Sequence, residues 1–428
     1  MKKVTRVILF ILFLISLPYL GKFNVKPVKG WTGTVYIRSD GSIDPVTAPI
    51  SIVGNFSYIL TGDIYGSLII QRTGAIIDGA NHTIQKPDGT AITIQANSVT
   101  LKGVVITESS TGIMMIGITG NNVIYNNTII DNQYGIQLSG DNCLNNLITA
   151  NIISKNIHGI LLEASDNRIY GNKITWNTYG IHLKCRNSEI FAVNNEIIGN
   201  DIIKNTYGIF LDGYDVYRNL IYHNNFIDNV NHIFFDNPCW DEFNSWDDGY
   251  PSGGNYWDDY AGIDADSDGI GDEPYFIREA SEVIQDRYPL IAPIKTFYVG
   301  TWQGMKFFVD IISNSTISDF YFNLDGKFIS FNVTGENGTI GFCRVTIPKD
   351  LLWVIDGWKV LINGQPVNYT ILPHTTNTYL SFNYQHSTKN VIIQGTHAIP
   401  ELPSTITLLP LLIFTALLAI VTKKRLLK

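Results

Sequence analysis

The sequence repeats one phrase five times between Asn122 and Phe235, N-x-I-x-x-N-x-I-x-x-N followed by a hydrophobic doublet. Successive copies are spaced by 24, 21, 28 and 24 residues, and three Asn positions stay in register. Periods in the twenties are typical of solenoids, in which each repeat is one unit that stacks on its neighbours. The predicted columns are Asn122, Asn146, Asn167, Asn195 and Asn219; Asn127, Asn151, Asn172, Asn200 and Asn224; and Asn132, Asn156, Asn177, Asn205 and Asn229.

The repeat favours strands over helices. Isoleucines alternate with polar residues at period two, as in Asn146-Leu147-Ile148, and the apolar runs are too short for helices. Leucine-rich repeats share the period but need several leucines and a helical segment per unit. A parallel β-helix is therefore predicted. We expect Asn at its corners, because Asn tolerates left-handed backbone angles and its amide can bond the same amide one coil along.

Composition shifts divide the chain into segments. A basic start followed by an apolar run from Val7 to Leu17 predicts a secretory signal, and the apolar stretch 405–422 before Lys423 and Lys424 predicts one membrane span. Alternation without the solenoid period predicts a β-sandwich after the solenoid. The predicted order is signal peptide 1–30, N-terminal cap 31–60, parallel β-helix 61–240, C-terminal cap 241–296, β-sandwich 297–396, linker 397–404, transmembrane helix 405–422 and cytoplasmic basic tail 423–428.

This all-β chain is thus expected to be secreted and held at the cell surface with most of its residues outside. Removing the seven cationic residues of the two membrane-directed ends changes the formal net charge from -8 to about -15, which argues against a nucleic-acid partner. Seven N-x-[ST] sequons lie in the external part and predict glycosylation. The pairing of Cys143, Cys185, Cys239 and Cys343 stays open, because none forms a C-x-x-C motif.

The C-terminal cap contains the motif most specific for a metal. Alternating carboxylates before a glycine can converge on one hard cation, for which calcium is the natural occupant. The proposed ligands are Asp264, Asp266, Asp268, the carbonyl of Ile270, and Asp272. Tyr275 replaces the usual final Glu, so Glu273 or Asp286 would complete the shell. The alternative is an acidic turn without an ion.

One column of aromatic residues predicts a binding surface. Tyr134, His158, Tyr179 and Tyr207 stand directly before the Gly of the Gly-Ile doublet in successive copies, and Asn231 takes this position in the last copy. Exposed aromatics along a rigid face can stack on sugar rings, whereas an aromatic ladder also stabilises a β-helix unaided. Trp176, in the column Asp131, Lys155, Trp176, Lys204 and Asp228, is a further candidate ligand-binding residue.

No catalytic residues are predicted. Asp247-Asp248 and Asp258-Asp259 fall in the cap outside the coils, and no column supplies an acid and base pair. His158, His182, His223 and His232 lie on different coils and columns, which gives no obvious metal pair.

The repeat "NLITANIISKNIHGILLEASDNRIYGNKITWNTYGIHL" resembles the NosD-type β-helix family, also described as the carbohydrate-binding and sugar-hydrolase (CASH) repeat. The segments "GGNYWDDY" and "DSDGIGDEPY" look like archaeal cell-surface members of that family. The resemblance implies a right-handed parallel β-helix outside the cell and, by the family name, a role in copper delivery. For copper the chain offers a Met pair, Met114 and Met115, without a Cys or His cluster.

These observations favour a membrane-anchored extracellular β-helix that binds a glycan or envelope polymer without catalysis. Two alternatives come from other classes. A polysaccharide hydrolase or lyase would need a carboxylate pair in a groove, and a copper-handling accessory protein would need a converging His and Met cluster.

Overall fold

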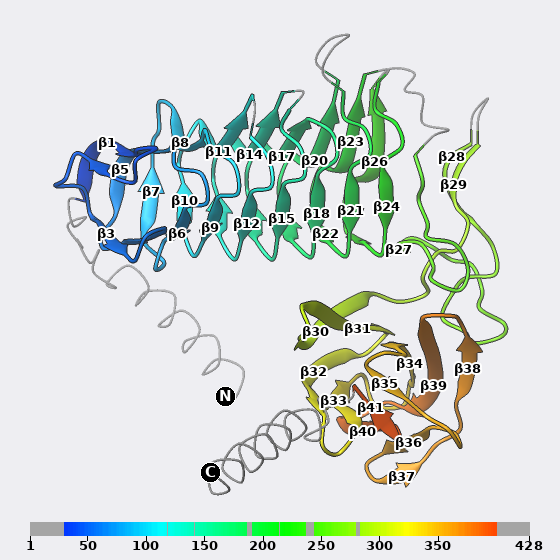
Figure 1. Ribbon diagram of the computed structural model, residues 1–428. Helices are drawn as coiled ribbons and strands as arrows, with labels where there is room; N and C mark the ends of the chain where they lie inside the picture. The colour runs from blue at the N-terminus through cyan, green and yellow to red at the C-terminus, as the bar shows by residue number, and fades with distance from the viewer. Residues whose placement is uncertain are drawn as a thin grey trace, which may run out of the picture.

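The computed structural model describes residues 30–399 apart from 118, 141, 186–190, 214, 237–243 and 280–282. A stack of parallel coils forms a β-helix of the right-handed type, and further antiparallel sheets follow it (Figure 1). Within the described residues no helix is long and apolar enough to cross a membrane. The predicted signal sequence through residue 29, the membrane span, the basic tail and Cys239 lie outside the described residues.

Each coil contributes one short strand to each of three faces. Face 1 contains β4 (Ser57–Leu60), β6 (Ile76–Asp78), β9 (Thr100–Lys102), β12 (Val123–Tyr125), β15 (Leu147–Thr149), β18 (Arg168–Tyr170), β21 (Glu196–Ile198) and β24 (Leu220–Tyr222). Face 2 contains β7 (Thr83–Gln85), β10 (Val105–Thr107), β13 (Thr128–Ile130), β16 (Ile152–Ser154), β19 (Lys173–Thr175), β22 (Asp201–Ile203), β25 (Asn225–Ile227) and β27 (Tyr256–Trp257). Face 3 contains β8 (Thr90–Ile94), β11 (Thr111–Ile116), β14 (Tyr134–Ser139), β17 (His158–Glu163), β20 (Tyr179–Lys184), β23 (Tyr207–Asp212) and β26 (Asn231–Asp236).

The first coil uses residues that precede the regular repeat. β1 (Trp31–Ile37) pairs in parallel with β5 (Ile64–Ile70), and β2 (Ile43–Asp44) pairs antiparallel with β1. β3 (Ile50–Val53) pairs antiparallel with β4. The predicted N-terminal cap therefore contains strands that continue the sheets of the solenoid.

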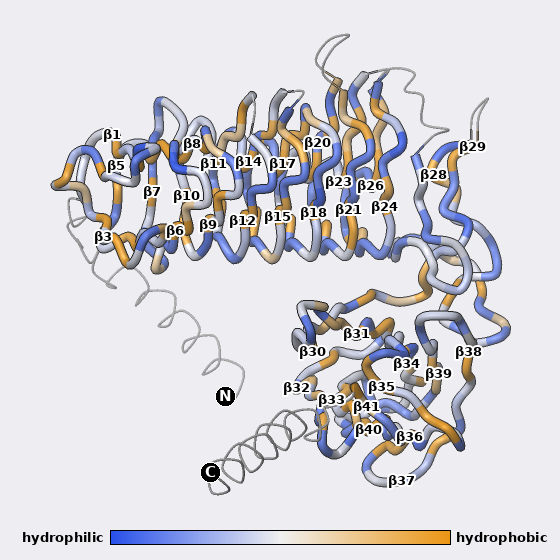
Figure 2. The backbone as a smooth tube through the Cα atoms, viewed as in Figure 1, coloured by the Kyte–Doolittle hydropathy of each residue, from blue (hydrophilic) through white to orange (hydrophobic). Residues whose placement is uncertain are grey.

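Period-two alternation explains why these strands form. The middle residue of most three-residue strands points inward and is fully buried, as Ile124, Ile148 and Ile169 are on face 1, while the flanking residues are at least partly exposed. Figure 2 shows hydrophobic and hydrophilic residues interspersed along the coils. Parallel pairing in unbroken register places each isoleucine on the isoleucine of the next coil. The solenoid core is thus a set of stacked apolar columns.

The Asn columns form internal hydrogen-bond ladders, as predicted. Asn151 is typical: its Oδ1 accepts from both the backbone N and the Nδ2 of Asn127, each at 3.0 Å. Its own Nδ2 donates to Asn172 Oδ1 at 3.0 Å and to the Ile124 carbonyl at 2.8 Å. Each amide oxygen thus accepts from the preceding coil, while the amide nitrogen donates to the amide oxygen of the following coil and also to a backbone carbonyl of the preceding one. The bonds between side chains all run the same way, which gives each ladder a direction.

The prediction that the ladder Asn themselves occupy the left-handed region is wrong. In all three columns the residue immediately before each ladder Asn has the positive φ instead, as Asn126, Ala150 and Lys155 show. The left-handed residue turns the corner, and the next residue can then point its amide inward. A side chain at the turning position is exposed, whereas the ladder Asn are buried.

Two further sheets follow the solenoid. One contains β30 (Ile294–Trp302), β31 (Met305–Ser313), β34 (Ile340–Pro348), β39 (Asn377–Gln385) and β38 (Thr370–Pro373); the other contains β32 (Thr316–Asn323), β33 (Phe328–Thr334), β40 (Lys389–Gln394), β36 (Lys359–Ile362) and β37 (Gln365–Pro366). Their inward residues share one apolar core that includes Val309, Phe331 and Leu380. β35 (Leu352–Trp353) pairs with β41 (His397–Ala398), so the first residues of the predicted linker belong to this sheet region.

The C-terminal sheets contact the end of the solenoid. Asn225 of β25 exchanges two hydrogen bonds with the backbone of Ile294, at 2.9 Å each. Tyr170 on face 1 meets Phe308 edge to face, with ring centroids 6.1 Å apart. The last coils therefore have part of face 1 covered by β30 and β31 (Figure 1).

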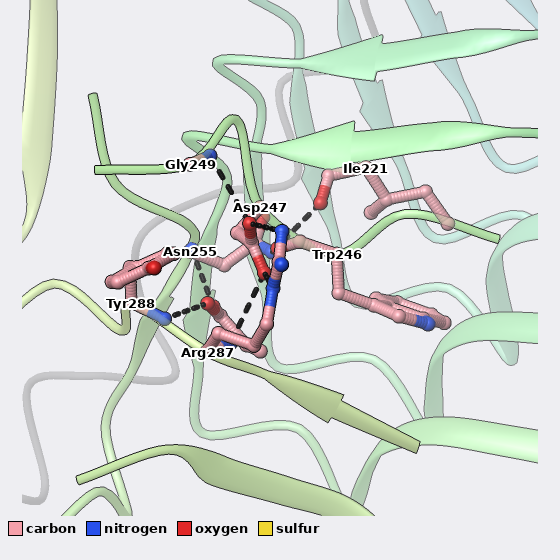
Figure 3. Close-up of polar contacts among 8 residues, drawn as sticks. Ile221, Trp246, Asp247, Gly249, Asn255, Arg287 and Tyr288 are labelled. Carbon is pink, nitrogen blue, oxygen red and sulfur yellow. Dashed lines mark hydrogen bonds and ion pairs between the residues drawn. The ribbon is translucent and has the colours of Figure 1, made fainter. Parts of the chain in front are cut away.

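A buried carboxylate ends the second Asn ladder. Asn255 continues that column, accepting from Asn224 and donating its backbone N–H to Asp286 Oδ2 at 2.7 Å. Figure 3 shows Asn255 close to Asp247, Arg287 and Tyr288. Asp286, in the hairpin of β28 (Tyr275–Glu279) and β29 (Val283–Asp286), also accepts from Trp257 Nε1 at 2.9 Å and from the Tyr288 N at 3.1 Å. Burial raises its pKa to about 7. The ladder direction explains this carboxylate, because the last amide of the column presents donors.

We predict that replacing a ladder Asn by Asp destabilises the protein far more than the same change one residue away. Asn146→Asp turns a buried donor into an acceptor facing the Thr119 carbonyl and Asn167 Oδ1. We expect a loss of about 3 kcal/mol or more in the free energy of unfolding. Asn145→Asp, at the exposed left-handed position, should change it by about 0.5 kcal/mol or less. Urea unfolding measures both, and equal losses would contradict the ladder.

A second prediction concerns pH. The folded pKa of Asp286, about 7, lies above its ordinary value of 3.8. The stabilising contribution of the protonated carboxyl is therefore fully present below about 3.8 and lost as pH rises through about 7. The indole N–H resonance of Trp257, which reports on this carboxylate, should titrate with a midpoint near 7. A Trp257 resonance constant from pH 5 to 9 would show the prediction to be wrong, and Asp286→Asn should abolish the titration.

Candidate functional site

The candidate site follows the corner between faces 2 and 3, which we call the Tyr corner. Two columns define it. The turning column is Asp131, Lys155, Trp176, Lys204 and Asp228, and the column at the start of the face 3 strands is Tyr134, His158, Tyr179, Tyr207 and Asn231. A buried ladder Asn lies between them in each coil, so the corner has the rigidity of the ladder beneath it.

The aromatic column forms a continuous stack. Ring centroids are 4.8 Å apart from Tyr134 to His158, 4.7 Å from His158 to Tyr179 and 5.3 Å from Tyr179 to Tyr207, with interplanar angles of 13° throughout. Each inner ring therefore has both faces covered by its neighbours. A ligand would meet these residues at ring edges and polar atoms, not by stacking on the faces as the sequence suggested.

The two histidines of this region are neutral near pH 7. His182 packs beside the stack, with its Nδ1 3.1 Å from His158 Nδ1 and its ring edge-on to Phe210. Burial lowers the pKa of both His158 and His182 to about 4. These side chains thus form part of an aromatic cluster that carries no charge at neutral pH.

Trp176 is the accessible aromatic of the corner. Its side chain has 60% of its surface exposed, and Lys204 Nζ lies 5.2 Å from the ring centroid. Its φ of 60° puts a bulky residue in the left-handed region, which costs about 1–2 kcal/mol. Every residue of the turning column shares this conformation, so the corner of the coil accounts for it. The exposed indole is what distinguishes Trp176 within that column. Lys204 also forms an ion pair with Asp228, at 3.9 Å.

The Tyr corner ends in a polar pocket at the last coil. The pocket has a volume of about 340 Å³ and is lined by Asp228, Asn229, Val230, Asn231, His232, Ile233, Asp258, Asp259, Tyr275 and Ile277. His232 Nε2 lies 2.9 Å from Asp258 Oδ1 and 3.4 Å from Asp259 Oδ1. The Tyr275 hydroxyl donates to Asp259 Oδ2 at 3.2 Å.

Sequence reasoning missed this pocket, since it placed Asp258 and Asp259 outside the coils and found no partner for His232. The sequence did contain a signal for this pocket, because His232 occupies the column in which earlier coils have glycine. A Cβ on Gly135, Gly159 or Gly180 would lie 2.5 Å from a carbonyl oxygen of the next coil. Within the described residues no further strand pairs with β26, so a side chain is tolerated there and reaches the cap.

The acidic loop brings together three of its predicted ligands. Carboxylate oxygens of Asp264, Asp266 and Asp268 lie within 4.8 Å of one another. Burial raises the pKa of Asp264 to about 6, despite hydrogen bonds from the backbone N of Asp268 and of Gly269. Burial also raises the pKa of Asp268, although Arg344 lies near enough to oppose that rise, and three carboxylates in this arrangement fit a hard divalent ion as well.

The other predicted calcium ligands are not in that group. Asp272 Oδ2 accepts from the Ala265 N at 2.9 Å, and the Ile270 N donates to Asp268 Oδ1 at 2.8 Å. Asp286 is already occupied by its three donors, so it does not complete the shell. The loop also contacts the C-terminal sheets, where Ser381 Oγ donates to the Asp268 carbonyl at 3.4 Å.

The sulfur-containing residues do not converge. Among the described cysteines, Cys143 and Cys343 are buried thiols. Met115 is buried in the core, and Met114 alternates to the outside of the same strand. The Met pair therefore does not form one copper site.

A second cavity lies in the C-terminal sheets. It has a volume of about 760 Å³ and a mainly apolar lining that includes Trp302, Trp353, Trp358 and Ile399. It is separate from the Tyr corner, and nothing in the described part of the chain shows what covers it.

The coils and their Asn ladders define a parallel β-helix protein. Residues 50–262 match the family model described as periplasmic copper-binding protein (NosD). The solenoid of this chain therefore belongs to the NosD family of parallel β-helices, as its repeat indicated.

The solved structures that match this chain do so at low sequence identity. The periplasmic alginate epimerase AlgG matches with 16% identity and a TM-score of 0.34, over 42% of this chain and 49% of that one. The tailspike protein gp49 of Acinetobacter baumannii bacteriophage Fri1, a capsular polysaccharide depolymerase, matches with 8% identity and a TM-score of 0.32, over 79% of each chain. This chain thus spans about half the length of AlgG. No curated protein matches its sequence.

Proposed function

We propose that this protein is an extracellular glycan-binding β-helix whose Tyr corner contacts the polymer, without catalysis of its own. The observation that carries the proposal is Trp176, an exposed indole at the turning position of its coil beside Lys204. Aromatic rings with a polar or charged neighbour suit sugars, which present both apolar faces and hydroxyl groups.

The shape of the corner supports a polymer over a small molecule. The exposed groups lie in line along successive coils, with Ile157 (48% exposed) and Val230 (76% exposed) beside the Tyr edges. The Asn ladder fixes their spacing, so little conformational entropy is lost when a chain binds. The parallel β-helix fold of this protein also occurs in proteins that act on polysaccharides, such as the depolymerase gp49.

Hydrolysis is the less favoured function. Glycosidases place two carboxyl groups on opposite sides of the bond that is cleaved. Asp258 and Asp259 are consecutive residues, and both face the same imidazole nitrogen. They therefore approach the pocket from one wall. Copper handling, which the family description would suggest, is disfavoured by the separation of Met114 from Met115.

The proposal includes a structural calcium ion at Asp264, Asp266 and Asp268. The ion would offset the repulsion of these carboxylates and fix the loop that contacts Ser381. Because the loop touches the C-terminal sheets, its order affects the junction between the sheets and the solenoid.

We predict that Trp176→Asn weakens glycan binding without lowering stability. Asn tolerates the left-handed conformation, so the unfolding midpoint should stay or rise, while retention on the preferred polysaccharide should fall about tenfold. Tyr321→Asn removes a comparably exposed aromatic, 56% exposed, from the C-terminal sheets and should leave binding unchanged. A polysaccharide panel scored for retention and for reducing-end release tests this. Release of reducing ends without retention would contradict the proposal and show that the protein cleaves the polysaccharide.

We also predict that calcium raises the melting temperature. Millimolar calcium should raise it by several degrees through binding to the folded state alone. Asp266→Asn should remove the shift, whereas Asp88→Asn, an exposed carboxylate in the turn before β8, should leave it intact. A melting temperature indifferent to both calcium and EDTA would exclude the structural ion.

A further inference from the structure

We infer that the pocket at the end of the Tyr corner binds an uncharged sugar residue through its hydroxyl groups and rejects uronic acids. This inference rests on the proposed glycan binding and names the chemical class of the glycan.

The pocket is the continuation of the Tyr corner in the last coil. Asp228 is the final member of the turning column that contains Trp176, and Asn231 is the final member of the aromatic column. Both line the pocket. A polymer that lies along the Tyr corner would therefore reach the pocket at the last coil.

The third Asn ladder ends beside His232. Asn205 donates its backbone N and its Nδ2 to Asn229 Oδ1, at 2.9 and 3.0 Å. The Nδ2 of Asn229 donates to the Ile202 carbonyl at 2.7 Å and lies 3.4 Å from His232 Nδ1. The Nδ1 of His232 therefore faces an amide donor, and its Nε2 faces the two carboxylates.

The orientation of this ring favours a hydrogen-bonding site over a metal site. A metal-bound histidine offers one nitrogen to the ion and donates the other N–H to an acceptor. Here the nitrogen that faces Asp258 and Asp259 lies at hydrogen-bond distance from Asp258, and the other nitrogen faces an amide donor instead of an acceptor. The Nε2–H thus donates to Asp258 and holds that carboxylate in place.

The carboxylates keep acceptor capacity for a ligand. Asp258 Oδ2 accepts from the Asp228 N at 2.6 Å, and Asp259 accepts from Tyr275. An ionised carboxylate has about four lone-pair positions, so each retains sites for further donors. The Asp259 side chain is 59% exposed and that of Asp228 is 60% exposed, which leaves both open to the pocket. Sugar hydroxyls are the donors that such acceptors bind.

The same carboxylates determine what is excluded. Lys204 pairs with Asp228 at the edge of the pocket, but the described lining itself contains no Lys or Arg, so Asp258 and Asp259 give it a negative potential. Burial raises the pKa of the Tyr275 phenol, so it stays a neutral donor. A uronate carboxylate placed a few ångströms from two aspartates is repelled enough to lose about tenfold or more in affinity.

Isothermal titration of the folded chain with two hexasaccharide series tests the inference. One series is uncharged (malto-, cello- and laminari-oligosaccharides), and the other consists of manno- and galacturonate oligomers. The variants are Asp259→Asn, Trp176→Asn and Asp325→Asn, the last an exposed carboxylate in the turn before β33 that serves as the control. Zinc alone is titrated in parallel.

We expect an uncharged series to bind at least about tenfold more tightly than the uronates. Asp259→Asn should weaken the binding of uncharged oligosaccharides and reduce the affinity ratio between the uncharged and the uronate series. Asp325→Asn should change neither quantity. Uronate binding that equals or exceeds uncharged binding would overturn the inference while leaving glycan binding intact. So would a preference that survives Asp259→Asn, or zinc binding that this substitution abolishes. If neither series binds, and Trp176→Asn changes nothing, the proposed function itself fails.

Discussion

The direction of the Asn ladders is the constraint on which the rest of this structure depends. Each amide oxygen accepts twice from the coil before it, and each amide nitrogen donates to the coil after it. A chain of such bonds polarises its members and fixes a single orientation for every amide. The stack therefore has two chemically different ends. At the C-terminal end the N–H donors of the last amide need acceptors from outside the ladder, as the backbone N–H of Asn255 does.

The chain meets that demand differently in two columns. The second column ends at the carboxylate of Asp286. This buried side chain joins the β28–β29 hairpin to the last coil through its hydrogen bond with Asn255. The third ends at the imidazole of His232, and this choice determines which ring nitrogen faces the pocket. Structural and candidate functional groups at this end thus share one origin, the polarity of the ladder.

Sequence reasoning reached the fold because the solenoid is local. Each coil contacts only its neighbours, so the spacing of Asn and Ile carries nearly all the information, and the parallel β-helix with its NosD resemblance follows. It did not reach the turning residues, because a positive φ one position before each Asn leaves no compositional mark when Lys155, Trp176 and Asn126 all occupy it. The pocket was out of reach for a similar reason. His232 and Asp258 meet across an aperiodic cap, and the contact of Asn225 with Ile294 spans 69 residues.

The glycine column has a consequence for how such a chain can change in length. Because Gly135, Gly159 and Gly180 each make room for the next coil, any whole coil can be inserted or removed between them without disturbing its neighbours. Only the final coil can carry His232, so the pocket always stays at the end. Each added repeat would move Trp176 about 4.8 Å further from that end. The number of coils between Trp176 and the pocket therefore sets the distance between these two points of contact on a polymer.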